Sequence, residues 1–315
     1  MDYPLPDSEM PAKGNETSPW IVLFCLVAFM LIGLVIGSLV TTGLITSLGF
    51  EGLSFLNTLK EEASLQQRNL ARWANLFPHL FAFTGGALLV ALLFFRSKWL
   101  QDLKLNHWPG WLFIGASFLF IVGIFPFAQT TYWINQQLPL PTWMKDMEQN
   151  ANELVKILLH MESPAELLLN LLTVGVVAAV GEELVFRGIV QQQLSKLLRQ
   201  PIAAIWVTAF IFSAIHMQFV GFLPRMFLGA GLGYLFHWSK SLWLPIIAHF
   251  LFNSLQVVAY YVLGENAGQF SPDQAIDGPN WLGGALGLVV IIVVGYYLSR
   301  MHKGAPPPPP LQNNH

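Results

Sequence analysis

Three short runs of the sequence carry ionisable or amide side chains inside otherwise apolar segments, at spacings that suit one face of a helix. An ionisable residue within a membrane helix costs roughly 2.5–3.5 kcal/mol, so it normally faces a bundle interior or a wet cavity and marks function. A carboxylate can take a proton from water, and imidazole and amide groups can stabilise an oxyanion, so these residue types suit hydrolysis. The runs are Gly181-Glu182-Glu183-Leu184-Val185-Phe186-Arg187, Phe212-Ser213-Ala214-Ile215-His216 and His249-Phe250-Leu251-Phe252-Asn253.

The spacing within the runs separates the two neighbouring glutamates. Glu183 precedes Arg187 by four residues, which is the favourable order for an ion pair within one helix. Glu182 points roughly 100° away around the same helix and is left without that partner. His249 and Asn253 are also four residues apart, so both side chains reach the same place from a single helix. We therefore expect a structural ion pair beside a carboxylate that remains available for chemistry.

The three runs lie at comparable depth in the expected helices. With a rise of roughly 1.5 Å per residue, Glu182 and His216 lie roughly 21–23 Å from the helix ends, and His249 and Asn253 roughly 12–18 Å. Taken singly, each motif has a structural explanation, since an ion pair can serve assembly and a buried histidine can bridge two helices. Together they predict one buried chamber.

The composition requires a membrane protein. Of 315 residues, 54% are hydrophobic and 11% charged, with a mean hydropathy of +0.52, whereas soluble domains carry about 25% charged residues. About 20 apolar residues span a bilayer as a helix. We predict an all-α, polytopic transmembrane helix bundle of about eight spanning helices, at residues 20–49, 79–95, 108–133, 165–194, 201–217, 219–238, 241–263 and 281–299.

The expected helices divide the chain into five parts, with the three runs confined to the third of them. That part therefore serves as the candidate catalytic core. The parts are a cytoplasmic N-terminal segment (1–19), three transmembrane helices with amphipathic loops (20–164), the core of helices four to seven (165–264), an outer loop with the eighth helix (265–300), and a disordered proline-rich tail (301–315).

Basic residues in short loops predict the orientation, because they mark the cytoplasmic side. They follow the second, fourth, sixth and eighth helices, all on one side of an eight-helix bundle, whereas the loop 264–280 is acidic. We expect an integral protein of the plasma membrane with both termini cytoplasmic. The loop 51–78 fits less well, since it holds Lys60, Arg68 and Arg72 on the other side; its apolar periodicity predicts an amphipathic helix along the interface.

Other features exclude several classes of function. A net charge of −2 without a basic stripe argues against nucleic acid as a partner. The single cysteine, Cys25, excludes an intramolecular disulfide and suggests packing. No His-Glu-x-x-His run is present, which excludes the zincin arrangement. The run Gly229-Ala230-Gly231-Leu232-Gly233 is typical of close helix approach.

The three runs, in this order on separate expected helices, resemble the motifs of the CAAX prenyl protease type II and bacteriocin-processing family of intramembrane proteases. The resemblance covers roughly residues 165–256 and includes Ser241-Leu242-Trp243 before the third motif. It implies that Glu182 and His216 bind and activate the attacking water, that His249 and Asn253 stabilise the oxyanion, and that Glu183 and Arg187 support the site.

The resemblance leaves metalloprotease and glutamate-dependent chemistry open. Glu182, His216 and His249 could form a zinc site with an open fourth position. We expect catalysis without a metal, because the sequence shows no further residues that would orient these three ligands.

We expect an intramembrane endopeptidase that hydrolyses a peptide bond in a membrane-associated protein or in a hydrophobic or lipidated peptide. The sequence gives no indication of whether the substrate is prenylated. One alternative is a non-catalytic membrane scaffold or a bacteriocin self-immunity protein. Another is a proton-coupled transporter, which an inverted repeat would indicate; the sequence contains no second Glu-Glu-x-x-x-Arg run.

Overall fold

The computed structural model describes residues 17–59, 63–264, 266–267 and 278–304, and every element within these ranges is a helix. The expected all-α bundle is therefore confirmed. Three predicted features lie outside the described residues: most of the N-terminal segment, the acidic loop with Asp273 and Asp277, and the proline-rich tail from residue 305 onwards. Residues 301–304, which we assigned to the disordered tail, instead continue the last helix.

Six helical runs in the described part are long and apolar enough to cross a membrane. All eight expected segments are helical, but α10 (Pro201–Ala214) is shorter than a span and α11 (Phe222–Ser239) is not among the six. The bundle also contains an amphipathic helix, α6 (Thr142–Leu159), that the sequence did not lead us to predict. The six runs are Pro19–Ser47 (α1), Leu65–Asp102, Trp111–Gln136 (α5), Pro164–Leu198, Trp243–Leu263 (α12) and Trp281–His302, the last within α13 (Trp281–Gly304).

Prolines and left-handed residues set several helix ends. Proline occupies the first turn of α1, of α7 (Pro164–Asn170) and of α10, where its missing N–H has no helical partner to lose. Arg199 (φ 54°) ends α9 (Gln191–Leu198), and Lys240 (φ 55°) ends α11. These left-handed caps produce the short basic turns that the sequence predicted.

The second membrane run begins at Leu65, not at His79 as expected. Its first part, α2 (Leu65–His79), starts at a capping box formed by Ser64 and Gln67. The helix continues without a loop into η2 (Leu80–Gly85), α3 (Gly86–Val90) and η3 (Ala91–Phe95). The run then ends in η4 (Arg96–Lys98) and α4 (Trp99–Asp102). A separate short helix, η1 (Gly52–Thr58), precedes the run. Half of the predicted loop 51–78 thus belongs to a long helical run.

Paired charges explain why Arg68 and Arg72 lie inside this run. Glu166 Oε1 accepts hydrogen bonds from Arg68 Nε at 2.9 Å and from Arg72 Nη1 at 2.8 Å, and all three side chains are buried. Arg68 Nη2 also reaches the exposed Glu162 at 2.7 Å, and this contact lowers the pKa of the Glu162 carboxyl. We call these residues the Arg68–Glu166 cluster. It joins α2 to the start of α7, which the sequence alone did not reveal.

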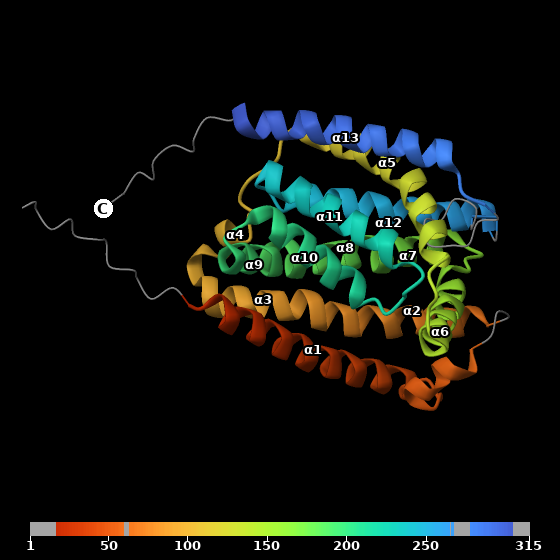
Figure 1. The fold of residues 1–315 in the computed structure, drawn as a ribbon. Helices are drawn as coiled ribbons and strands as arrows, with labels where there is room; N and C mark the ends of the chain where they lie inside the picture. The colour runs from red at the N-terminus through yellow and green to blue at the C-terminus, as the bar shows by residue number, and fades with distance from the viewer. Residues whose placement is uncertain (1–16, 60–62, 265, 268–277, 305–315) are drawn as a thin grey trace, which may run out of the picture.

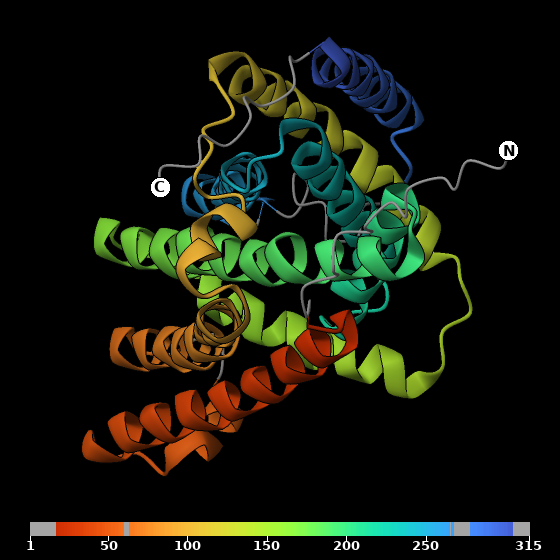
Figure 2. The same cartoon turned by 90° about the vertical axis from the view of Figure 1, so that its left-hand side faces the viewer.

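In Figure 1, α1 lies along one edge of the bundle, and α13 lies beside α5 along the opposite edge. The end view shows the continuous run Pro164–Leu198 crossing the centre between these edges (Figure 2). Figure 1 also shows that α1 begins and α13 ends at the same end of the bundle.

The basic loops meet at that shared end. Leu242 N donates to Lys104 O at 2.9 Å, and His302 Nδ1 lies 2.9 Å from Trp238 O. Burial and the charge of Lys104 lower the pKa of Lys240, because the two lysines lie near each other at this end of the bundle. Segments that follow the second, sixth and eighth expected helices are thus neighbours, as one common side of the membrane requires.

Close packing of α1 fixes the segment around His79. A Cβ atom on Gly37 would lie 2.5 Å from Pro78 Cα, and one on Gly33 would overlap the Phe81 carbonyl group. Only glycine allows α1 to lie this close to the junction of α2 and η2. The backbone on both sides of His79 is therefore held against a neighbouring helix.

We predict that Glu166→Gln destabilises the protein far more than Glu162→Gln does. Both carboxylates bind Arg68, but loss of the Glu166 charge leaves two buried guanidinium groups undercompensated, which typically costs about 3–5 kcal/mol. Glu162 is 65% exposed, so water replaces its contact. Thermal melting of the purified variants in detergent measures the difference. Equal melting temperatures would contradict a structural role for the cluster.

Candidate active site

The central run carries its two glutamates on α8 (Ala178–Val185), a short α-helical segment between two π-helical turns. These turns are η5 (Leu171–Val177) and η6 (Phe186–Val190). Single π turns inside α-helices occur frequently at functional sites, because the wider turn redirects the side chains that follow. In this run, the α-helical hydrogen-bonding pattern is therefore replaced by π-helical turns on both sides of the segment that carries Glu182 and Glu183.

Glu183 contacts two other side chains of the site through one carboxylate oxygen. Its Oε1 accepts from Arg187 Nη1 at 2.7 Å, so the ion pair that the spacing predicted is present, with both side chains fully buried. The same oxygen lies 2.8 Å from His249 Nδ1. Arg187 Nη2 in turn donates to Gly229 O at 2.7 Å. One buried carboxylate thus links α8 to α12 directly and to α11 through Arg187.

The contact with Glu183 determines which nitrogen of His249 is available. A carboxylate oxygen only accepts, so His249 Nδ1 carries the hydrogen of this bond. His249 Nε2 points the other way and lies 3.8 Å from Glu182 Oε2. The ring is therefore fixed in orientation, with Nε2 turned towards the second glutamate.

Glu182 has one bound oxygen and one that is open. Its Oε1 lies 3.2 Å from His79 Nε2, whereas its Oε2 is buried and has no hydrogen-bond partner among the described residues. The side chain of Glu182 is 10% exposed, compared with 0% for Glu183. Glu183 Oε2 likewise has no hydrogen-bond partner among the described residues. The two adjacent carboxylates therefore differ in that Glu183 is paired with Arg187, whereas Glu182 is not part of that ion pair and is the more accessible.

His216 lies just beyond the helix in which it was expected. The predicted helix 201–217 ends as α10 at Ala214, because the chain turns at residues 215 and 216 and Met217 adopts a positive φ of 55°. His216 Nδ1 lies 2.7 Å from Phe212 O. Since a carbonyl only accepts, Nδ1 carries the hydrogen, and in the neutral ring Nε2 can accept a proton.

The ring of Phe212 connects His216 to the rest of the site. Its centroid lies 5.0 Å from that of His216 and 6.0 Å from that of His249, and the Arg187 guanidinium lies over it at 5.0 Å. His216 is also within electrostatic range of Glu182. Phe212, the first residue of the second motif, thus packs against His216, His249 and Arg187.

Asn253 lies one turn after His249 on α12, as its spacing required. Its Nδ2 donates to Val174 O in η5 at 2.9 Å. The π turn therefore supplies the carbonyl that orients this amide. An amide nitrogen carries two hydrogens, so one donor of Asn253 remains for another acceptor.

His79 is a site residue that the sequence reasoning missed. It was taken only as the first residue of an apolar stretch, but its ring contacts Glu182 from α2. The sequence did contain one indication of this role, because His79 is an ionisable residue at the border of a membrane segment that has no charged residue.

The possible zinc ligands do not form a metal site in this arrangement. No group of three or more His, Cys, Asp or Glu side chains within the described ranges is placed to hold a metal ion. Glu182 Oε1 is bound to His79 instead. Glu182, His216 and His249 therefore do not form a preassembled zinc centre among the described residues.

The glycine run in α11 allows the close contacts that the sequence predicted. A Cβ on Gly229 would lie 3.1 Å from the Phe212 ring, and one on Gly231 would lie 2.5 Å from Phe120. Because Gly229 also supplies the carbonyl for Arg187, the small residues place α11 within reach of the ion pair.

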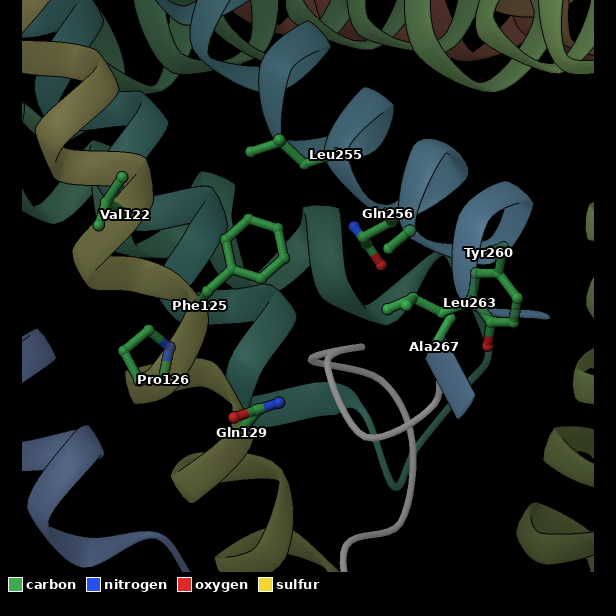
Figure 3. A pocket seen from close by; sticks show the side chains of 10 residues that line it. Val122, Phe125, Pro126, Gln129, Leu255, Gln256, Tyr260, Leu263 and Ala267 are labelled. Carbon is green, nitrogen blue, oxygen red and sulfur yellow. The ribbon is translucent and has the colours of Figure 1, made fainter. Parts of the chain in front are cut away.

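A largely apolar cavity of about 490 Å³ opens between α5 and α12, beginning two residues after Asn253 (Figure 3). Its α12 wall includes Leu255 and Gln256, and Figure 3 shows Phe125 of α5 facing them. The cavity lies further along α12 than the histidine and asparagine of the site. The lining residues are Val122, Phe125, Pro126, Gln129, Leu255, Gln256, Ala259, Tyr260, Leu263 and Ala267.

Residues 164–255 match the family model described as type II CAAX prenyl endopeptidase Rce1-like. The matched segment contains all three motifs, so the resemblance seen in the sequence is confirmed for this part of the chain. No curated protein and no solved structure gives a significant match. The match supports a CAAX-type membrane protease, and with the apolar helices it supports an integral multi-pass membrane protein.

The geometry predicts that Glu183→Gln and Arg187→Met both lower the melting temperature strongly. Each leaves a partner without charge compensation in the bundle interior, at a typical cost of about 3–5 kcal/mol. The double variant should recover part of the loss, because no unpaired charge remains. Thermal melting in detergent measures all three, with Lys196→Met, an exposed basic residue at the end of the same run, as the control.

Proposed function

We propose that the chain is an intramembrane endopeptidase in which Glu182 acts as the base that activates water. The observation that carries this proposal is that Glu182, unlike Glu183, is not paired with an arginine, and that its Oε2, which accepts no hydrogen bond from the described residues, lies 3.8 Å from His249 Nε2. The adjacent Glu183 already compensates Arg187, so Glu182 has no role in that ion pair. A carboxylate beside imidazole groups in an enclosed site is suited to general base catalysis.

In the proposed reaction, Glu182 and His216 bind a water molecule and take a proton from it as its oxygen attacks the scissile carbonyl carbon. The tetrahedral intermediate then collapses as the carbon–nitrogen bond breaks, and the proton passes to the leaving amine. The fixed Nδ1 hydrogen of His216 supports this assignment, because it leaves Nε2 as the basic nitrogen. All atoms of the added water end in the two products.

His249 and Asn253 are proposed to stabilise the oxyanion. Asn253 can donate through the amide hydrogen that Val174 does not use. His249 can donate through Nε2 only when both ring nitrogens are protonated, because Nδ1 already donates to Glu183. Each fixed donor of this kind contributes roughly 2.7–4 kcal/mol to transition-state stabilisation.

The proposed substrate is a membrane-associated protein or a hydrophobic or lipidated peptide. Glu182, His249 and Asn253 lie in helical runs that are long and apolar enough to cross a membrane, and the apolar cavity is lined by residues further along the helix that carries Asn253. That cavity suits an apolar side chain or a lipid chain of the substrate. The basic end of the bundle is proposed to face the cytoplasm, with both termini on that side of the plasma membrane.

We predict that Glu182→Gln abolishes cleavage without loss of stability. The amide preserves the volume and still accepts from His79, but it is not a base. His216→Ala should behave similarly. The test measures melting temperature and cleavage of membrane-protein substrates in liposomes, with the exposed Glu153→Gln as the control. Proteins retained by Glu182→Gln but not by wild type identify the substrate.

The same experiment separates a protease from a non-catalytic scaffold. Full cleavage by Glu182→Gln would contradict the proposed base. A wild-type protein that binds the retained proteins without cleaving them would instead favour the scaffold function.

We further predict that catalysis proceeds without zinc. The expectation rests on the described residues, among which Glu182, His216 and His249 are not grouped so that they could hold a metal ion. Cleavage should be unchanged after treatment with a strong chelator, and metal analysis of the active protein should give zinc well below one ion per chain. Stoichiometric zinc that is lost together with activity, and restored together with it, would overturn the prediction.

A further inference from the structure

His79 contacts the proposed base from a helix outside the segment that matches the protease family. Its Nε2 lies 3.2 Å from Glu182 Oε1, and because a carboxylate only accepts, Nε2 carries the hydrogen. Its Nδ1 is buried and has no hydrogen-bond partner in the part of the chain that the structure describes. The side chain is 19% exposed. The orientation of His79 is thus defined by Glu182 alone among its polar contacts.

Packing holds the His79 ring in one plane. The ring stacks on Phe83 with centroids 4.3 Å apart and an angle of 7° between the planes. A Cβ on Gly181 would lie 3.0 Å from Phe83 Cβ and 3.3 Å from His79 Cε1, so the residue before Glu182 has to be small. Phe83 lies in η2, the π turn that starts directly after His79. The π turn therefore places the supporting ring and the histidine in contact.

The backbone that carries His79 is fixed by α1. Gly37 allows α1 to pack on Pro78, and Gly33 allows it to pack on Phe81. Neither position tolerates a side chain without displacement of the junction. Two helices of the N-terminal part thus determine where the His79 ring lies.

We propose that His79 is a positioning residue for Glu182, an inference that rests on the proposed function. A glutamate carboxylate rotates readily about its terminal bond, because this torsion is broad. A hydrogen bond from His79 to Oε1 stops that rotation and directs Oε2 towards His249 Nε2, where the water is activated. The N-terminal helices α1 and α2 thereby complete a site whose reactive residues all lie within residues 164–255.

The proposal is tested by comparing His79→Gln with His79→Asn. The amide nitrogen of glutamine reaches the position of histidine Nε2, whereas that of asparagine reaches only the position of Nδ1. Both variants are polar and uncharged, so a merely structural role would affect them alike. We expect His79→Asn to lower kcat by up to about a hundredfold, since a misplacement of about 1 Å in the reacting geometry can cost that much, with KM within about twofold. His79→Gln should retain most of the wild-type kcat.

A matched control is available in His160, whose Nε2 lies 3.3 Å from Glu162 on the protein surface. His160→Asn should leave kcat and KM unchanged. Equal kcat values for His79→Asn and His79→Gln, or a loss confined to KM, would overturn the positioning role. Glu182→Gln is measured in parallel: if it cleaves normally, the proposed function itself fails, and if it is inactive while His79→Asn is fully active, only the present inference fails.

A second variant covers the case in which the His79 variants do not fold. Phe83→Leu removes the stacking ring but leaves both hydrogen-bonding groups in place. It should lower kcat by a smaller factor than His79→Asn while KM stays unchanged. A wild-type kcat for a stably folded Phe83→Leu would contradict the proposal, because the His79 ring would then need no fixed plane.

Discussion

The structure depends on the neutralisation of a fully buried carboxylate, that of Glu183. A charge in the interior of a membrane bundle is tolerated only when it is paired and hydrogen-bonded. Arg187 and His249 provide this compensation at Oε1 of Glu183, and Arg187 Nη2 also donates to the carbonyl of Gly229. Three helical segments are therefore joined at one point. This joint also fixes the orientation of His249, so the structural and the chemical parts of the site share one constraint.

The adjacent residue, Glu182, is placed by the same helix but lies outside this network. The two side chains point in different directions, and π turns on both sides of α8 adjust the helix to its neighbours. Glu183 is paired with Arg187, whereas Glu182 is not part of that ion pair and is slightly exposed. The ion pair between Glu183 and Arg187 holds the same helix that carries Glu182, so the contacts that stabilise the fold also position the proposed base.

The N-terminal helices are more than a membrane anchor for the core. The Arg68–Glu166 cluster joins α2 to α7. Gly33 and Gly37 allow α1 to pack closely against the junction at Pro78. Both contacts act on the helical run that carries His79. The part of the chain that matches the protease family is thus packed against helices that lie outside the match, and one of those helices reaches into the site.

The sequence by itself determined the membrane class, the helical segments, the Glu183–Arg187 pair and the place of the close helix contacts. These features follow from local properties: apolar length, four-residue spacing and small side chains. The start of the second run at Leu65, the end of α10 before His216 and the contact of His79 with Glu182 were decided only in the tertiary structure. The reason is that each depends on a partner distant in the chain. From the sequence, Arg68 was assigned to a loop, because its partner Glu166 lies far along the chain. His79 was assigned to a helix end, because its partner Glu182 lies on α8.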